Sequence, residues 1–72
     1  MNQDWYEIWV DESPGFPYVL ILCPNKNNSQ EFLIIDPQEK GSIIQTMADY
    51  ESAKLWLSED EYTLVDGRMT SD

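Results

Sequence analysis

The strongest constraint on the fold of this chain comes from two apolar segments that lie close together in the sequence. Residues 18–23 read YVLILC and residues 31–36 read EFLIID, and both are rich in the β-branched and aromatic residues that favour strands. The polar segment PNKNNSQ between them predicts a loop, so we expect a hairpin. Because side chains alternate between the faces of a strand, these two strands carry apolar residues on both faces. A sheet with one face in water should instead alternate apolar and polar residues, so both faces of this sheet need cover.

A further strand is predicted on the N-terminal side of the hairpin. Residues 5–12 (WYEIWVDE) alternate in the way that a half-buried strand does. One face of this strand carries Tyr6, Ile8 and Val10, and the other carries Trp5, Glu7, Trp9 and Asp11. The SPGFP motif that follows is typical of a turn, and Pro37 ends the strand over residues 31–36.

Residues 42–47 fit two structures. Their first four residues, SIIQ, match a capping box that would begin a helix running to about residue 58. Against this, QEKG is a good four-residue turn, and Ile43, Ile44 and Thr46 are β-branched. We therefore predict a fourth strand here rather than a helix.

A helix is predicted from about residue 50 to residue 58. Asp49 is a good N-cap residue, because its carboxylate accepts hydrogen bonds from free backbone N–H groups. At 100° per residue, one face of this helix carries Tyr50, Ala53 and Leu57, with Trp56 beside them. Leu55 falls nearly opposite. We expect the first face to pack on the sheet.

The acidic run of Glu59, Asp60 and Glu61 marks the end of the helix, because like charges at the negative end of a helix dipole disfavour its continuation. Residues 61–65 (EYTLV) predict a last short strand that ends at Asp66-Gly67, and we expect residues 67–72 to fray. The predicted order is therefore β-β-β-β-α-β. This is a single small α+β domain over residues 1–72 with a mostly antiparallel sheet and an ordered core from about residue 4 to residue 66.

A single helix, about 10 to 12 Å wide, covers only one face of such a sheet. Three arrangements would cover the other face: the sheet curls toward a partial barrel, two copies stack, or a partner binds. Trp5 and Trp9 share a face of their strand, and aromatic residues are favoured at interfaces, although ordinary core or sheet-face packing is the simpler explanation for them. Our candidate partner-binding residues are Trp5, Trp9, Glu59, Asp60 and Glu61.

The charge of the chain limits its partners. There are 14 acidic residues against four Lys and Arg, for a formal net charge of −10. Binding to phosphate groups needs cationic side chains, so we expect no direct contact with nucleic acid or an anionic membrane. The acidic charge instead suits a basic protein surface, or it simply promotes solubility.

Most catalytic and metal chemistry lacks its usual residues here. There is no histidine, and Cys23 is the only cysteine, so the chain forms no internal disulfide and a reducing cytoplasm suits it best. We interpret Cys23 as an inert buried thiol. Glu59–61 are contiguous and lack the spacing of a calcium loop, and the three glycines form no phosphate-binding loop. The apolar segments are too short to span a bilayer. We therefore predict no catalytic, metal or cofactor site and no enzymatic activity.

Two functions remain open. The first is a small non-enzymatic, acidic cytoplasmic interaction module or accessory subunit, which could be a homodimer formed through a sheet face or edge. The second is an acidic inhibitor or nucleic-acid mimic that binds a basic protein surface. The second function requires the carboxylates to gather in one continuous stripe, whereas scattered carboxylates would argue against it.

Overall fold

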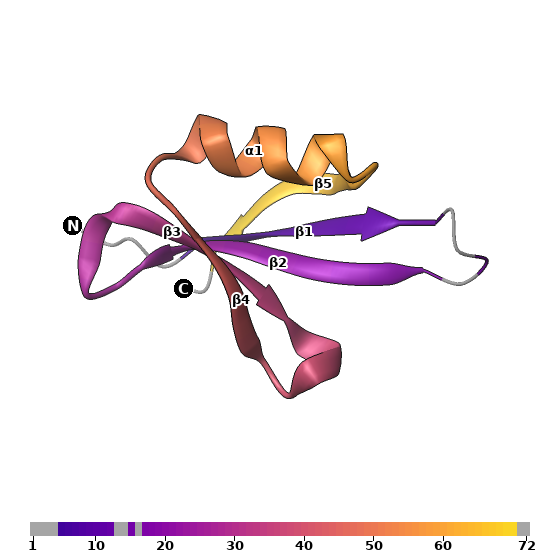
Figure 1. The fold of residues 1–72 in the computed structure, drawn as a ribbon, viewed down its shortest axis with the longest axis horizontal. Helices are drawn as coiled ribbons and strands as arrows, with labels where there is room; N and C mark the ends of the chain where they lie inside the picture. Colours follow the sequence, from indigo (N-terminus) through magenta and orange to yellow (C-terminus); the bar gives the residue numbers. More distant parts are fainter. Residues whose placement is uncertain (1–4, 13–14, 16, 71–72) are drawn as a thin grey trace.

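A five-stranded antiparallel sheet with one α-helix on one face makes up the computed structural model, which describes residues 5–12, 15 and 17–70 (Figure 1). In chain order the elements are β1 (Trp5–Asp11), β2 (Tyr18–Asn25), β3 (Asn28–Asp36), the 3₁₀ turn η1 (Pro37–Glu39), β4 (Ser42–Met47), α1 (Tyr50–Glu59) and β5 (Thr63–Thr70). The strand order is β4-β3-β2-β1-β5. The predicted α+β class and element order are confirmed, and the sheet is open, with β4 and β5 at its edges.

The hairpin between β2 and β3 is tighter than predicted. In place of a loop over residues 24–30, both strands continue to a turn at Lys26 and Asn27. Asparagine side chains stabilise this turn: the backbone N–H of Asn27 donates to Oδ1 of Asn25 at 3.0 Å. Nδ2 of Asn25 in turn donates to Oε1 of Glu31 at 3.2 Å. The polar residues therefore extend the strands instead of forming a loose loop.

Residues 42–47 form a strand, as predicted, and not the start of a helix. The turn before it uses two residues in the left-handed region, Lys40 (φ 63°) and Gly41 (φ 77°). Gly41 donates its backbone N–H to the carbonyl of Asp36 at 3.0 Å. This turn reverses the chain so that Ser42 pairs with Asp36 and β4 follows β3 back.

Helix α1 begins and ends close to the predicted residues. Oδ1 of Asp49 accepts a hydrogen bond from the backbone N–H of Ser52 at 2.7 Å, which confirms the N-cap. At the other end, the carbonyl of Leu57 accepts the N–H groups of Asp60 and Tyr62, and Glu61 adopts φ 70°. Leu55 is 58% exposed, so the predicted outer face of the helix is confirmed.

The prediction that the last strand ends at Asp66-Gly67 is wrong. β5 continues to Thr70, so residues 67–70 do not fray, and residues 71–72 lie outside the described residues. Asp66 (φ 60°) and Gly67 (φ 80°) form a bulge, because Val65 pairs with Ile8 and the next paired residue, Arg68, pairs with Glu7. After the bulge the strand pairs with β1 again, and Nε of Arg68 lies 3.3 Å from Oε2 of Glu7.

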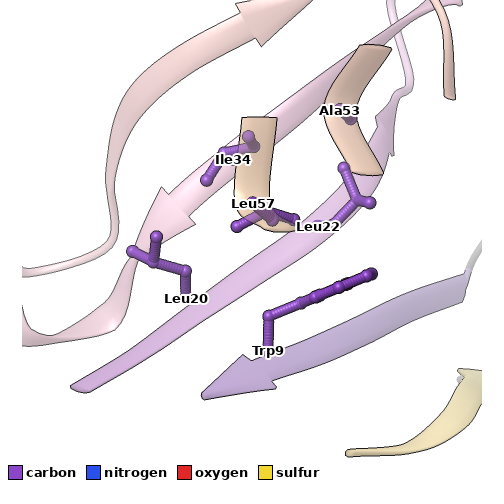
Figure 2. Packing of buried hydrophobic residues seen from close by; sticks show 6 residues of the cluster. All are labelled: Trp9, Leu20, Leu22, Ile34, Ala53 and Leu57. Atoms are coloured by element: carbon purple, nitrogen blue, oxygen red, sulfur yellow. The ribbon is translucent and has the colours of Figure 1, made fainter. Parts of the chain in front are cut away.

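The buried core lies between α1 and the sheet. Figure 2 shows its six apolar side chains, which come from three strands and the helix: Trp9, Leu20, Leu22, Ile34, Ala53 and Leu57. All six are at most 4% exposed. Burial of such side chains, at roughly 1.5–3 kcal/mol each for the large ones, is the main source of stability in a domain of this size.

Candidate functional site

In the described part of the chain, one face of the sheet is covered by a helix and the other is not. Helix α1 lies along one face, and among the described residues no α-helix lies over the other (Figure 1). We call the second face the outer sheet face and define it by the apolar residues that the strand register places there. These are Tyr6, Ile8, Val10, Val19, Ile21, Cys23, Leu33, Ile35, Ile43, Val65 and Met69.

The apolar residues of the outer sheet face are continuous across the strands. Ile8 pairs with Ile21, Ile21 with Ile35 and Ile35 with Ile43, so one apolar row crosses from β1 to the β4 edge. Ile8 also pairs with Val65 of β5. None of these residues is fully buried, and at the edges Ile43 is 56% exposed and Val65 37% exposed.

The outer sheet face carries almost no charge. Among the described strand positions that the register places on this side, Glu31 is the one charged residue, and it lies at the hairpin end of β3. A sheet face made for water would instead carry polar residues at these alternate positions.

The helix-side face carries the first of two buried carboxylates, Glu7. Its side chain accepts three hydrogen bonds, from Nε1 of Trp9 (3.2 Å), the hydroxyl of Tyr50 (2.6 Å) and Nε of Arg68 (3.3 Å). The guanidinium of Arg68 also lies 3.7 Å from the ring centroid of Trp5. Burial and the hydrogen bond to Glu7 raise the pKa of Tyr50. This cluster joins α1, β1 and β5, and with its oxygens in use Glu7 serves to hold these elements together.

The second buried carboxylate, Asp36, lies at the end of β3. Its Oδ2 accepts the hydroxyl of Tyr18 at 2.9 Å, and its Oδ1 accepts the backbone N–H of Gln38 at 2.9 Å. The hydrogen bond to Asp36 is the main reason that the pKa of Tyr18 is raised. Sequence analysis missed both carboxylates as buried groups. The available signal was that each follows or interrupts a run of apolar strand residues.

The structure places the two tryptophans on the helix side of the sheet. They do share one face of β1, but Trp9 is 4% exposed and belongs to the core. Trp5 packs against Phe32 and Tyr50, with ring centroids 6.1 Å away in both cases. Ordinary core packing therefore explains both tryptophans, and they do not lie on the uncovered sheet face. The uncovered residues of β1 are Tyr6, Ile8 and Val10.

The predicted acidic residues lie at the end of α1 and are only partly brought together with others. Glu59 ends the helix, and Asp60 and Glu61 form the exposed turn before β5. Glu61 contributes to an open hollow of about 330 Å³ whose lining also contains Asp11 and Glu12. Within the described part of the chain, no group of three or more Cys, Asp or Glu residues is placed to hold a metal ion.

Cys23 is half-buried on the outer sheet face, where it pairs with Leu33. Burial raises the pKa of its thiol, so little of it is the reactive thiolate near neutral pH. The thiol therefore has the character of an apolar residue in this face.

None of the described helices is both long and apolar enough to cross a membrane. Comparison with known proteins gives no significant match to a family model, a curated protein or a solved structure. Any functional proposal therefore depends on the geometry of this chain alone.

Proposed function

We propose that this chain is a non-enzymatic protein interaction module that binds through its outer sheet face. The observation that carries this proposal is the apolar row from Val65 through Ile8, Ile21 and Ile35 to Ile43, which no described helix covers. The ends of this row, Ile43 and Val65, are exposed and its middle is half-buried, and a continuous apolar surface open to solvent is typical of binding sites.

The size of the face supports the same proposal. Strands lie about 4.8 Å apart and rise about 3.3 Å per residue, so five strands of about six residues present roughly 24 by 20 Å, or about 500 Å². The largest apolar patch of an ordinary monomer is about 300–600 Å² and is often functional. The lone thiol of Cys23 makes a reducing cytoplasm the proposed location.

An acidic inhibitor or nucleic-acid mimic is the weaker alternative. In its favour, Asp11, Glu12 and Glu61 line one hollow. Against it, Glu7 is 1% and Asp36 3% exposed, so neither is available to a basic partner. Glu31 lies on the outer sheet face, opposite to the side of Asp11. These carboxylates therefore lie in separate parts of the structure and not in the single stripe that a nucleic-acid mimic requires.

The proposed function is tested with a pair of lysine substitutions. Ile21→Lys places a charge in the middle of the apolar row, and Leu55→Lys makes the same change of net charge on the exposed side of α1. Tagged wild-type chain in a lysate of its source cells should migrate in a complex larger than the monomer. We expect Ile21→Lys to abolish that complex and Leu55→Lys to retain it, with circular dichroism showing that both variants fold. Monomeric migration of the wild-type chain in the lysate would refute the proposal.

A further inference from the structure

We infer that the outer sheet face binds a second copy of this chain, giving a face-to-face homodimer in which two sheets stack between two outer helices. This inference rests on the proposed function and names its partner. Three observations carry it: the condition of the two sheet edges, the area of the face and the distribution of charge.

Both edges of the sheet are built in a way that discourages pairing with another strand. On β4, Gln45 pairs with Ile34 and Ile43 with Ile35, so Ile44 is an extra residue that forms a bulge. On β5, the bulge at Asp66-Gly67 interrupts the edge in the same way. Bulges twist an edge strand away from regular pairing, and they are a common protection against edge-to-edge association. The outer sheet face has no comparable protection, which favours association through the face.

The area of the face matches the lower limit of a specific dimer. Two faces of about 500 Å² bury roughly 1,000 Å² in total, which is about the minimum for a biological interface. Two antiparallel sheets of the same twist pack face to face at about 10 Å with their strands about 30° apart. A second copy therefore matches this twisted face, and an interface near the minimum area is that of a weak dimer.

The charge distribution favours a second copy over a basic partner. The chain has a net charge of −10, but on the described strands the outer sheet face has only Glu31, at one end. A basic protein would be attracted to the acidic surfaces elsewhere, whereas two neutral faces can meet without burying a row of unpaired charges. The two acidic chains nevertheless repel each other at long range. Added salt screens this repulsion, so the homodimer should tighten as salt rises, while a complex with a basic protein should loosen.

Sedimentation equilibrium of the purified chain tests the homodimer, from micromolar to millimolar protein and at low and high NaCl. The proteins are wild type, Ile21→Lys, Val65→Lys and the control Leu55→Lys. Val65 is already 37% exposed, so its substitution keeps the test valid if Ile21→Lys fails to fold. Alkylation of Cys23 is a second readout, because a stacked partner should slow it as protein concentration rises.

We expect a dimer whose dissociation constant falls several-fold from low to high salt. Each face variant should raise that constant by about tenfold or more, because it buries a lysine without a partner. Leu55→Lys should change it by no more than about twofold, the size expected for a surface charge. A chain that stays monomeric at every concentration, a dimer that loosens with salt, or a dimer that both face variants retain would overturn the homodimer. If the pure chain is monomeric but an Ile21-dependent complex forms in lysate, the proposed function stands and only the homodimer falls.

Discussion

At the scale of single residues, Glu7 lies on the buried face of β1 with its carboxylate fully hydrogen-bonded. By composition, the face with Tyr6, Ile8 and Val10 is the more apolar, yet the face with Glu7 and Trp9 packs under α1. A carboxylate is expensive to bury unless it is paired and hydrogen-bonded. Glu7 meets this condition because three side chains donate hydrogen bonds to it. One of these donors is Arg68, which is among the four Lys and Arg residues of the chain.

Removing the Glu7 carboxylate should therefore destabilise the fold strongly. We expect Glu7→Ala to lower the free energy of unfolding by about 2 kcal/mol, because Nε1 of Trp9 and the hydroxyl of Tyr50 lose their charged acceptor. Urea unfolding followed by tryptophan fluorescence measures it. The control Glu12→Ala removes an exposed carboxylate of the same strand region and should leave the urea midpoint nearly unchanged. Equal midpoints for the two variants would contradict a stabilising role for the Glu7 cluster.

The raised pKa values of three tyrosines predict how the free energy of unfolding changes at alkaline pH. The hydrogen bond to Asp36 raises the pKa of Tyr18, and burial raises the pKa values of Tyr50 and Tyr62. In the unfolded chain these phenols lose their protons near pH 10, before they do so in the folded chain. Their contribution is therefore complete below about pH 10 and is lost as pH rises through the folded pKa values.

Urea unfolding at a series of pH values should show a constant free energy of unfolding just below pH 10 and a steep fall above it. Tyr62→Phe removes one of the three groups and should make the fall less steep. In an ultraviolet absorbance titration, tyrosinate should form later in the folded chain than in the chain unfolded in guanidinium. Coincident titrations of folded and unfolded chain would contradict the raised pKa values.

At the scale of elements, the bulge at Asp66-Gly67 allows β5 to be long enough to carry Arg68. Gly67 has φ 80°, and a Cβ added there would meet nothing within 4 Å. A substitution at Gly67 therefore costs stability through its backbone conformation and not through a steric clash with a neighbour. Gly67→Ala should lower the free energy of unfolding by about 1 kcal/mol, the usual cost of a left-handed L-residue. Gly67→Asn should cost less, because Asn tolerates this region best among ordinary residues.

Urea unfolding of the two Gly67 variants measures the difference in their free energies of unfolding. Amide hydrogen exchange shows which residues lose protection. Exchange should quicken in residues 68–70 of Gly67→Ala before it does in β2 and β3. If alanine and asparagine are equally well tolerated, left-handed backbone at Gly67 is not what the bulge requires.

The same bulge shows what sequence could and could not predict. Local signals were sufficient for α1, because the Asp49 cap and the spacing of Ala53 and Leu57 are contained in a few residues. They also favoured a strand over residues 42–47, which the structure has. Asp66-Gly67 was interpreted as a strand end because the residue that resumes the pairing, Arg68, has its partner Glu7 61 residues earlier, and no local pattern shows that pair.

At the scale of the whole molecule, one small core supports a sheet that is apolar on both faces. The doubly apolar pattern of β2 and β3 predicts this from the sequence, since one helix can cover only one face. Leu22 and Ile21 are neighbours in β2 that point to opposite faces. Leu22 is fully buried under α1, and Ile21 is half-buried on the outer sheet face.

This pair of neighbours gives the last prediction. In dilute protein, Leu22→Ala should lower the free energy of unfolding by about 3 kcal/mol, because it opens a cavity in a closed core. Ile21→Ala should cost only about 1 kcal/mol, because water already reaches that side chain and no cavity forms. Urea unfolding at two protein concentrations measures both variants. As concentration rises, the wild type should gain stability through association and Ile21→Ala should gain less, while Leu22→Ala should gain as the wild type does. Equal costs for the two substitutions in dilute protein would mean that the outer sheet face is already covered within the monomer.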